Sequence, residues 1–336
     1  MKILIDVMSG DNAPGEILRG AADAARAFAP AIAVVGQRTV IESVSAEEGI
    51  DLSEIEICDA PSVITMEDAA LSVMREKRDS SMAVGLDMLA HGEADAFVSA
   101  GNTGALVAGA TLIVRKIKGV RRAAIGAVLP FSSPLLLLDS GANLELVPSD
   151  YLQLAGLGGV YAERILGRKS PRVGLLNNGA EKTKGGADLQ EAYRLLSEGE
   201  GIDFVGNVEA RDLPFGVCDV IVTDGFTGNA VLKLTEGLGS FLFTKLKETM
   251  TADLASRLSA AVLKPKLKAM KKEFSASEYG GAPLIGISMP VIKAHGSSDA
   301  RAICSAVRQA IGIVSSGVIP EMARIAARSS QNDQKQ

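Results

Sequence analysis

Short apolar runs alternate with helix-length segments along the first 235 residues of the chain. The runs lie at 2–6, 31–35, 55–58, 96–98, 123–129, 135–138, 172–176 and 220–222. Each is only a few residues long and rich in aliphatic or β-branched side chains, which is typical of buried strands. Between them lie segments of helical spacing, for example 15–28, 65–77, 81–91, 103–114 and 151–166. The alternation predicts an α/β fold of three layers, a mainly parallel sheet covered by helices on both faces.

The alternation stops after Glu236, where apolar residues recur every fourth position. These residues are Leu242, Leu246, Met250, Leu254, Leu258 and Val262. Pro265 interrupts the helical run that follows, so we expect two helices that form a projecting hairpin at about 236–275. The hairpin is an insertion in a single large α/β domain, 1–330. A polar tail, 331–336, is expected to be disordered.

The hairpin carries two features that indicate partners. An unpaired apolar stripe would leave a large apolar face exposed, so we expect the hairpin to pair with that of a second subunit in a homodimer. Its second arm combines an apolar tip with Lys264, Lys266, Lys268, Lys271 and Lys272. The tip residues are Leu254, Leu258, Val262 and Leu263. This combination suits peripheral contact with an anionic membrane; a solvated lysine-rich helix face is the alternative.

Two strand ends have the composition of an anion-binding turn. The first is Asp224-Gly225-Phe226-Thr227-Gly228-Asn229 after the run 220–222, and the second is Ser99-Ala100-Gly101-Asn102-Thr103-Gly104 after the run 96–98. A glycine turn that opens a helix directs free backbone N–H groups and the positive end of the helix dipole at its occupant. We therefore expect an anion at both turns, with a plain strand-to-helix turn as the alternative. Neither turn matches a dinucleotide fingerprint or a P-loop.

Other strand ends carry polar residues of the same kind. Asp6, Gly10 and Asp11 follow the first strand, where open α/β sheets bind ligands, although Asp11 also suits a turn or helix cap. Asn143 ends a small polar turn that begins at Asp139. Lys184 lies in a glycine-flanked loop after the run 172–176.

Composition excludes several classes of protein. The 336 residues are 47% hydrophobic and 22% charged, enough for a large core. The net charge of −5 argues against nucleic-acid binding, which needs a positive field. Three isolated cysteines and two histidines form no zinc motif, so we expect a reducing cytoplasm and no metal. The N-terminus does not have the form of a signal peptide, and no apolar run is long enough to span a bilayer.

Eight segments together carry a family resemblance. They are MSGDNAP, SAGNTGA, LDSGAN, NNGAEKTKG, FVGNVEARD, VTDGFTGN, LKLTEG and GGAPLIG…IKAHGSS. From Asp6 to about Gly312, in order and spacing, the chain resembles the bacterial phosphate acyltransferase family of phospholipid synthesis (PlsX). Ser9, the stretch 143–146 and the stretch 287–289 depart from the usual pattern of the family.

The resemblance implies that an acyl group passes from acyl-[acyl-carrier protein] to inorganic phosphate, giving acyl phosphate and free carrier protein. Direct attack by phosphate needs no protein nucleophile and no cofactor, and the chain has no convincing nucleophile motif. By this resemblance Asn102, Thr103, Thr227, Gly228 and Asn229 would hold phosphate or the developing oxyanion. Gly101, Gly104 and Asp224 would shape the same turns.

Two further residues acquire roles from the same resemblance. Lys184 would neutralise phosphate charge, with a solvated loop lysine as the alternative. His295 would donate to phosphate or pass a proton to the leaving sulfur, unless it only caps the following helix.

The resemblance also implies a location and a fold. The product would pass to a membrane glycerol-3-phosphate acyltransferase, so we expect a cytoplasmic protein at the inner face of the plasma membrane. The fold would be Rossmann-like, as in isocitrate and isopropylmalate dehydrogenases or phosphotransacetylases. Two kinds of alternative stay open. One is another enzyme with similar phosphate loops, either a phosphotransacetylase-like enzyme that uses short-chain acyl-CoA or a decarboxylating dehydrogenase that depends on NAD and a divalent metal. The other is a non-catalytic membrane scaffold for lipid-synthesis enzymes.

Overall fold

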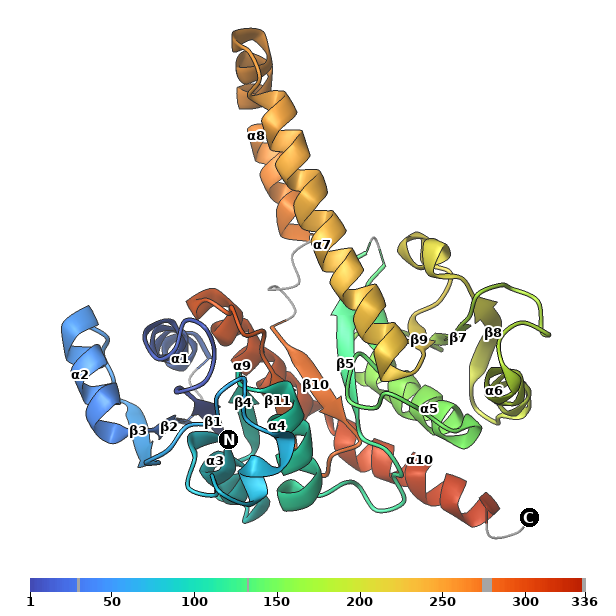
Figure 1. The fold of residues 1–336 in the computed structure, drawn as a ribbon, viewed down its shortest axis with the longest axis horizontal. Helices are drawn as coiled ribbons and strands as arrows, with labels where there is room; N and C mark the ends of the chain where they lie inside the picture. Colours follow the sequence, from blue (N-terminus) through green and yellow to red (C-terminus); the bar gives the residue numbers. More distant parts are fainter. Residues whose placement is uncertain (29–30, 132, 274–279, 334–336) are drawn as a thin grey trace.

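A computed structural model describes residues 1–28, 31–131, 133–273 and 280–333, without the side chains of some residues in α8 and α10. Its described strands form one sheet in the order β3-β2-β1-β4-β11-β10-β5-β6-β9-β7-β8 (Figure 1). The strands are β1 (Lys2–Asp6), β2 (Ala31–Gly36), β3 (Ile55–Asp59), β4 (Ala96–Ser99), β5 (Ala124–Leu129), β6 (Leu135–Leu138), β7 (Arg172–Leu176), β8 (Asp203–Val208), β9 (Val220–Val222), β10 (Ala282–Ile285) and β11 (Val291–Lys293).

Both flanks of the sheet are parallel, and its centre is antiparallel. β3, β2, β1, β4 and β11 form one parallel flank, and β6, β9, β7 and β8 form the other. Three antiparallel pairings join them, β11 with β10, β10 with β5 and β5 with β6. Three reversals leave the two flanks running in opposite directions. The predicted mainly parallel sheet is confirmed, and the reversal at its centre is an addition that the sequence did not indicate.

The helices lie on both faces of the sheet, as predicted (Figure 1). They are α1 (Gly15–Phe28), α2 (Arg38–Glu48), α3 (Ser81–Ala90), α4 (Thr103–Gly109), α5 (Pro148–Arg164), α6 (Ala187–Glu198), α7 (Gly225–Met250), α8 (Leu254–Glu273), α9 (Ala300–Ser316) and α10 (Val318–Asp333). Short 3-10 segments lie at η1 (Ala70–Met74) and η3 (Ala210–Phe215), and a π segment, η2 (Ala110–Val114), continues α4.

Alternate residues of the strands belong to two different cores. In β1, Ile3 and Ile5 join the core under α1, α5 and α9, whereas Leu4 joins the core under α3 and α4. All three side chains are fully buried. Because successive side chains of a strand point to opposite faces, this division shows that both faces of the sheet are covered.

The hairpin projects from the body and begins earlier than predicted (Figure 1). The helix that opens after Asp224 continues without a break to Met250, so the expected strand-end helix and the first hairpin arm are one helix, α7. α8 packs back against it. Pro265 lies inside α8 and does not interrupt it. A proline removes one helical donor, and on an exposed helix water satisfies the freed carbonyl.

Three local features of the structure bear on the predictions. The helix predicted at 65–77 is wrong, because only η1 is helical there and the residues before it form a loop. The tail expected to be disordered from 331 is helical to Asp333, and 334–336 lie outside the described residues. Among the described residues no single helix is long and apolar enough to cross a bilayer; α9 with 318–327 passes that test only as a pair bent by 57°.

Candidate active site

Three loops meet where β1, β4 and β11 end. Asp11 donates its backbone N–H to the carbonyl of Gly296 at 2.8 Å, so the first loop lies against the third. Gly10 has φ +116°, and a Cβ there would lie 3.1 Å from both the Ala100 side chain and the Gly296 carbonyl. A side chain at Gly101 would likewise collide with Ser9 and Met82. These glycines are needed because the loops approach at backbone contact.

Asp6 organises this junction from inside. It is fully buried, accepts a hydrogen bond from the Ser99 hydroxyl at 2.8 Å and accepts another from the backbone N–H of Met8. Burial raises the pKa of the Asp6 carboxyl, and these hydrogen bonds oppose the rise. Asp6 therefore ties β1 to β4 below the surface of the site.

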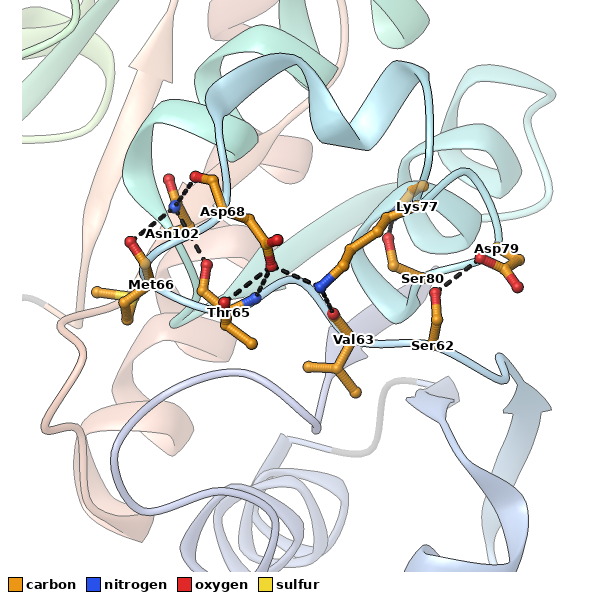
Figure 2. A network of polar contacts seen from close by, with 10 residues as sticks. Ser62, Val63, Thr65, Met66, Asp68, Lys77, Asp79, Ser80 and Asn102 are labelled. Carbon is orange, nitrogen blue, oxygen red and sulfur yellow. Dashed lines mark hydrogen bonds and ion pairs between the residues drawn. The ribbon is translucent and has the colours of Figure 1, made fainter.

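The Asn102 amide is already engaged within the protein. Its oxygen caps α4 by accepting from the backbone N–H of Ala105 at 3.0 Å. Its nitrogen lies 3.0–3.2 Å from the carbonyls of Thr65, Met66 and Asp68 (Figure 2). These contacts favour a positioning role for Asn102, which holds the 65–68 loop beside the site.

The held loop continues into an ion pair. Lys77 Nζ lies 2.6 Å from Asp68 Oδ2 and also donates to the carbonyl of Val63 (Figure 2). The Lys77 contact, together with hydrogen bonds from Thr65, lowers the pKa of Asp68 to about 2. At the start of α4, Thr103 and Gly104 remain near the surface, and among the described residues their N–H groups have no hydrogen-bond partner.

The turn before α7 is capped by the protein itself. Asp224 caps the helix, accepting from the N–H and the hydroxyl of Thr227, both at 2.8 Å. The N–H of Gly225 donates to the Asn143 carbonyl at 2.6 Å, and that of Gly228 donates to the Asp224 carbonyl. The carboxylate of Asp224 thus takes the Thr227 N–H, one of the donors that we expected to face an external anion, because a cap residue competes for the same N–H groups.

Asp139, which the sequence did not single out as a site residue, holds the facing loop. Its buried carboxylate accepts hydrogen bonds from the backbone of Ile125, Gly141, Ala142 and Asn143 and from the Asn143 amide. The Asn143 amide also donates to the Ala123 carbonyl. Asn143 is therefore a structural residue of this loop, on which the first turn of α7 is seated.

After its first turn, the exposed face of α7 contacts the loop that follows β11. Asn229 lies against Gly141, and its side chain has no hydrogen bond among the described residues. One turn further on, Lys233 Nζ lies 3.5 Å from His295 Nε2 and 2.9 Å from Glu236. His295 Nδ1 lies 2.8 Å from the Ser297 hydroxyl. These contacts bring Asn229 and His295 to the same region, joined through Lys233.

Lys293 is a second cation at this place. It donates to the carbonyls of Ala100 and Ala294. Burial and, after it, the charge of Lys233 lower the pKa of Lys293, Asp11 and Asp6 partly offset them, and the net result is a pKa of about 8. Lys233 and Lys293 were missed as site residues, although both lie in the segments LKLTEG and IKAHGSS that carry the family resemblance.

Lys184 makes no described contact with the residues of this cluster. Its Nζ is 3.8 Å from Glu181 and its side chain is 45% exposed. The aliphatic part of the side chain packs over Gly179. The loop follows β7, which pairs with β9 in parallel, so the loop and the start of α7 are at one edge of the sheet. No described contact joins Lys184 to Asn229 or Asn102.

The hairpin tip is described only in part. Val262 is 79% exposed and Leu263 is 43% exposed, as a surface-binding tip requires. The side chains of Leu254 and Leu258 lie outside the described residues. A cavity of about 410 Å³ opens elsewhere, between α1 and α9, and includes none of the predicted site residues.

The fold defines the class of protein. A phosphotransacetylase from Streptococcus pyogenes matches with a TM-score of 0.65 at 16% identity, over 95% of this chain and 94% of that one. A 4-hydroxythreonine-4-phosphate dehydrogenase from Klebsiella pneumoniae matches with a TM-score of 0.58 at 14% identity, over 94% and 99%. The chain thus has the α/β/α fold that phosphotransacetylases share with such dehydrogenases.

Sequence comparison then gives the family. Residues 1–321 match the family described as "Fatty acid synthesis protein". "Phosphate acyltransferase" of Bacillus subtilis is 45% identical over 95% of this chain and 96% of its own, and that of Caldicellulosiruptor saccharolyticus is 46% identical over 92% and 93%. The chain belongs to the phosphate acyltransferase family of fatty acid and phospholipid synthesis, and the predicted resemblance is confirmed.

Proposed function

We propose that the protein transfers an acyl group from acyl-[acyl-carrier protein] to inorganic phosphate. A phosphate oxygen attacks the thioester carbonyl carbon, and the C–O bond forms as the carbonyl becomes an oxyanion. The oxyanion then collapses, the C–S bond breaks, and the carrier's thiolate leaves and takes up a proton. A thiol has a pKa of about 8.5, so its thiolate departs with little assistance. Acyl phosphate and free carrier protein are the products.

The observation that carries this proposal is the meeting of α7 with the β11 loop. Lys233 and His295 lie 3.5 Å apart beside the exposed Asn229, where loops from β1, β4 and β11 converge. Cations and N–H donors in one place stabilise both a phosphate nucleophile and a developing oxyanion. Membership in the phosphate acyltransferase family supports the same chemistry.

Trapping the product tests the proposal. Purified protein is incubated with acyl-carrier protein, phosphate and hydroxylamine, which converts acyl phosphate into a hydroxamate. We expect hydroxamate only when phosphate is present. A product made only from short-chain acyl-CoA would assign the enzyme to the phosphotransacetylase type, and no product with either donor would favour a scaffold.

Asn229→Ala and Lys184→Ala then test the residues. Asn229 borders the cluster, so its loss should lower turnover at least about tenfold, as for loss of a transition-state donor. Lys184 would act as an electrostatic partner of phosphate from the neighbouring strand end, and its loss should lower turnover too. Lys182→Ala, in the same loop, is the control. Normal turnover in both site variants would remove these two residues from the mechanism.

We also propose that the protein is a homodimer that contacts anionic membrane through the hairpin. Exposed Leu238, Phe241 and Leu242 on α7 support a subunit interface, and exposed Val262 and Leu263 support a membrane-binding tip. The double substitution Val262→Glu with Leu263→Glu should release the protein from anionic liposomes, whereas Phe215→Glu, at an exposed site on η3, should not. Unchanged liposome binding of the double variant would contradict the membrane proposal.

The dimer is tested by sedimentation. The double substitution Leu238→Glu with Leu242→Glu should give monomers, and unchanged sedimentation would contradict the dimer proposal.

A further inference from the structure

Lys293 is a largely buried cation that lacks a carboxylate partner. Its Nζ donates to two backbone carbonyls, those of Ala100 and Ala294, and among the described residues no carboxylate lies within ion-pair distance of it. A buried charge is costly when no opposite charge compensates it. A ligand of opposite charge would compensate it.

The charged groups around Lys293 come from three elements. Asp6 and Asp11 belong to the β1 loop, Lys233 and its partner Glu236 belong to α7, and His295 follows Lys293 on the β11 loop. Glu236 is already paired with Lys233. Asp6 is fully buried and engaged with Ser99. Asp11 acts on Lys293 through its charge but forms no ion pair with it, so among the described residues no single carboxylate bridges the two lysines.

We propose that Lys293 and Lys233, with His295 beside them, bind the inorganic phosphate that attacks the thioester, and that binding requires Lys293 to be protonated. This inference rests on the proposed function and names the residues that hold its nucleophile. The surface position of Lys233 and His295 leaves them accessible to a small anion. Lys293 lies two residues before His295, near enough for the charge of Lys233 to lower its pKa. A phosphate dianion can accept hydrogen bonds from several donors at once, so one phosphate could bind both lysines. No single carboxylate of the described residues does so here.

Protonation gives the proposal a pH signature. Burial and Lys233 hold the pKa of Lys293 at about 8 in the absence of ligand. Above that pH the unliganded protein loses the Lys293 charge, so the dissociation constant of phosphate should rise roughly tenfold for each further pH unit. Asp6 and Asp11 also act on Lys293, so the Lys293→Met variant, which keeps both carboxyl groups, separates the Lys293 transition from any effect of theirs.

Phosphate binding is measured without any acyl donor. The probe is inorganic phosphate, titrated at constant ionic strength with sodium chloride, and the readout is the phosphate-dependent rise in melting temperature, which reports binding to the folded protein. Wild-type protein should bind phosphate at pH 7 and lose at least tenfold in affinity by pH 9.5. Lys293→Met should bind at least tenfold more weakly at pH 7, with no transition near pH 8.

Lys233→Gln has a matched control on the same helix. Lys233 and Lys245 both lie on α7, are similarly exposed and pair with a glutamate three residues on, Glu236 and Glu248. Lys233→Gln should weaken phosphate binding about three- to tenfold, and Lys245→Gln should not change it. This pair decides the question if Lys293→Met fails to fold.

The outcomes separate this inference from the proposed function. Equal phosphate affinity in Lys233→Gln and Lys245→Gln, or a wild-type affinity that stays flat from pH 7 to 9.5, would overturn the subsite. Acyl phosphate would still form in that case if the proposed reaction is right. Conversely, lysine-dependent phosphate binding without any acyl phosphate from acyl-carrier protein would support the subsite and reject the proposed donor.

Discussion

Gly228 allows the first turn of α7 to pack in direct contact with the Asp139 loop, and Gly228→Ala should force the helix away from that loop. A Cβ at this position would lie 1.9 Å from the Asp139 carbonyl oxygen and 3.0 Å from Thr223 Cγ2. Because such contacts do not fall below 3.0 Å, helix and loop would have to separate by roughly 1 Å. Overpacking of this kind costs about 1–3 kcal/mol, and backbone cannot rotate away as a side chain can.

Gly237→Ala is the control, because a Cβ there meets nothing within 4 Å. It lies in the same helix, where alanine is more favourable than glycine by about 1 kcal/mol. Urea unfolding at equal protein concentration should therefore lower the midpoint for Gly228→Ala and raise it for Gly237→Ala. Acyl phosphate formation should fall on the order of 100-fold in Gly228→Ala alone, since a 1 Å displacement moves Asn229 and Lys233. Equal midpoints in the two variants would show that α7 is not seated as described.

Two further predictions concern Lys293 and Asn102. The pKa of Lys293 is about 8 in the folded protein against 10.5 ordinarily, so the unfolded chain binds more protons between these values, and stability should rise with pH there by up to roughly 3 kcal/mol. This rise, measured by urea unfolding in phosphate-free buffer from pH 7.5 to 10, should be absent in Lys293→Met; parallel curves would refute the assignment. Asn102→Ala should destabilise by about 1 kcal/mol through loss of the α4 cap and should speed proteolysis of the 65–68 loop. Asn102→Asp keeps the cap oxygen but loses the donors, so it should leave that loop equally sensitive; protection in Asn102→Asp would argue against the tether.

Periodicity and turn composition were enough to predict the layers of the fold. Runs such as 220–222, followed by glycine turns, marked strand ends correctly, because a buried strand and a tight turn each restrict residue type locally. The helix predicted at 65–77 failed for a tertiary reason. The carbonyls of Thr65, Met66 and Asp68 accept from Asn102, which is 34–37 residues away in sequence, so that stretch cannot use them in a helix.

The sequence indicated some residues of the candidate site but missed its two lysines Lys233 and Lys293. Asn229 and His295 were singled out, and the structure joins them through Lys233. Apart from its place in the segment IKAHGSS, Lys293 has no feature in the sequence that separates it from a surface lysine, because its burial becomes visible only in the fold. Asp224 and Asn102 were expected to shape or contact a ligand, and in the structure they are the N-cap residues of α7 and α4. The sequence shows which turns are polar. Which acceptor each hydrogen-bond donor of a turn binds depends on neighbouring residues that only the fold brings close.

The length of α7 explains how one site draws on both flanks of the sheet. The flanks run in opposite directions, so in a flat sheet the ends of β9 and β11 would lie at opposite edges. α7 starts at the end of β9, and eight residues of helix carry the chain about 12 Å, from Gly225 to Lys233. There Lys233 meets His295 at the end of β11. A break in α7 between Asn229 and Lys233 would therefore separate the two halves of the site while leaving each half intact, which makes the continuous helix, rather than either loop alone, the element that assembles it.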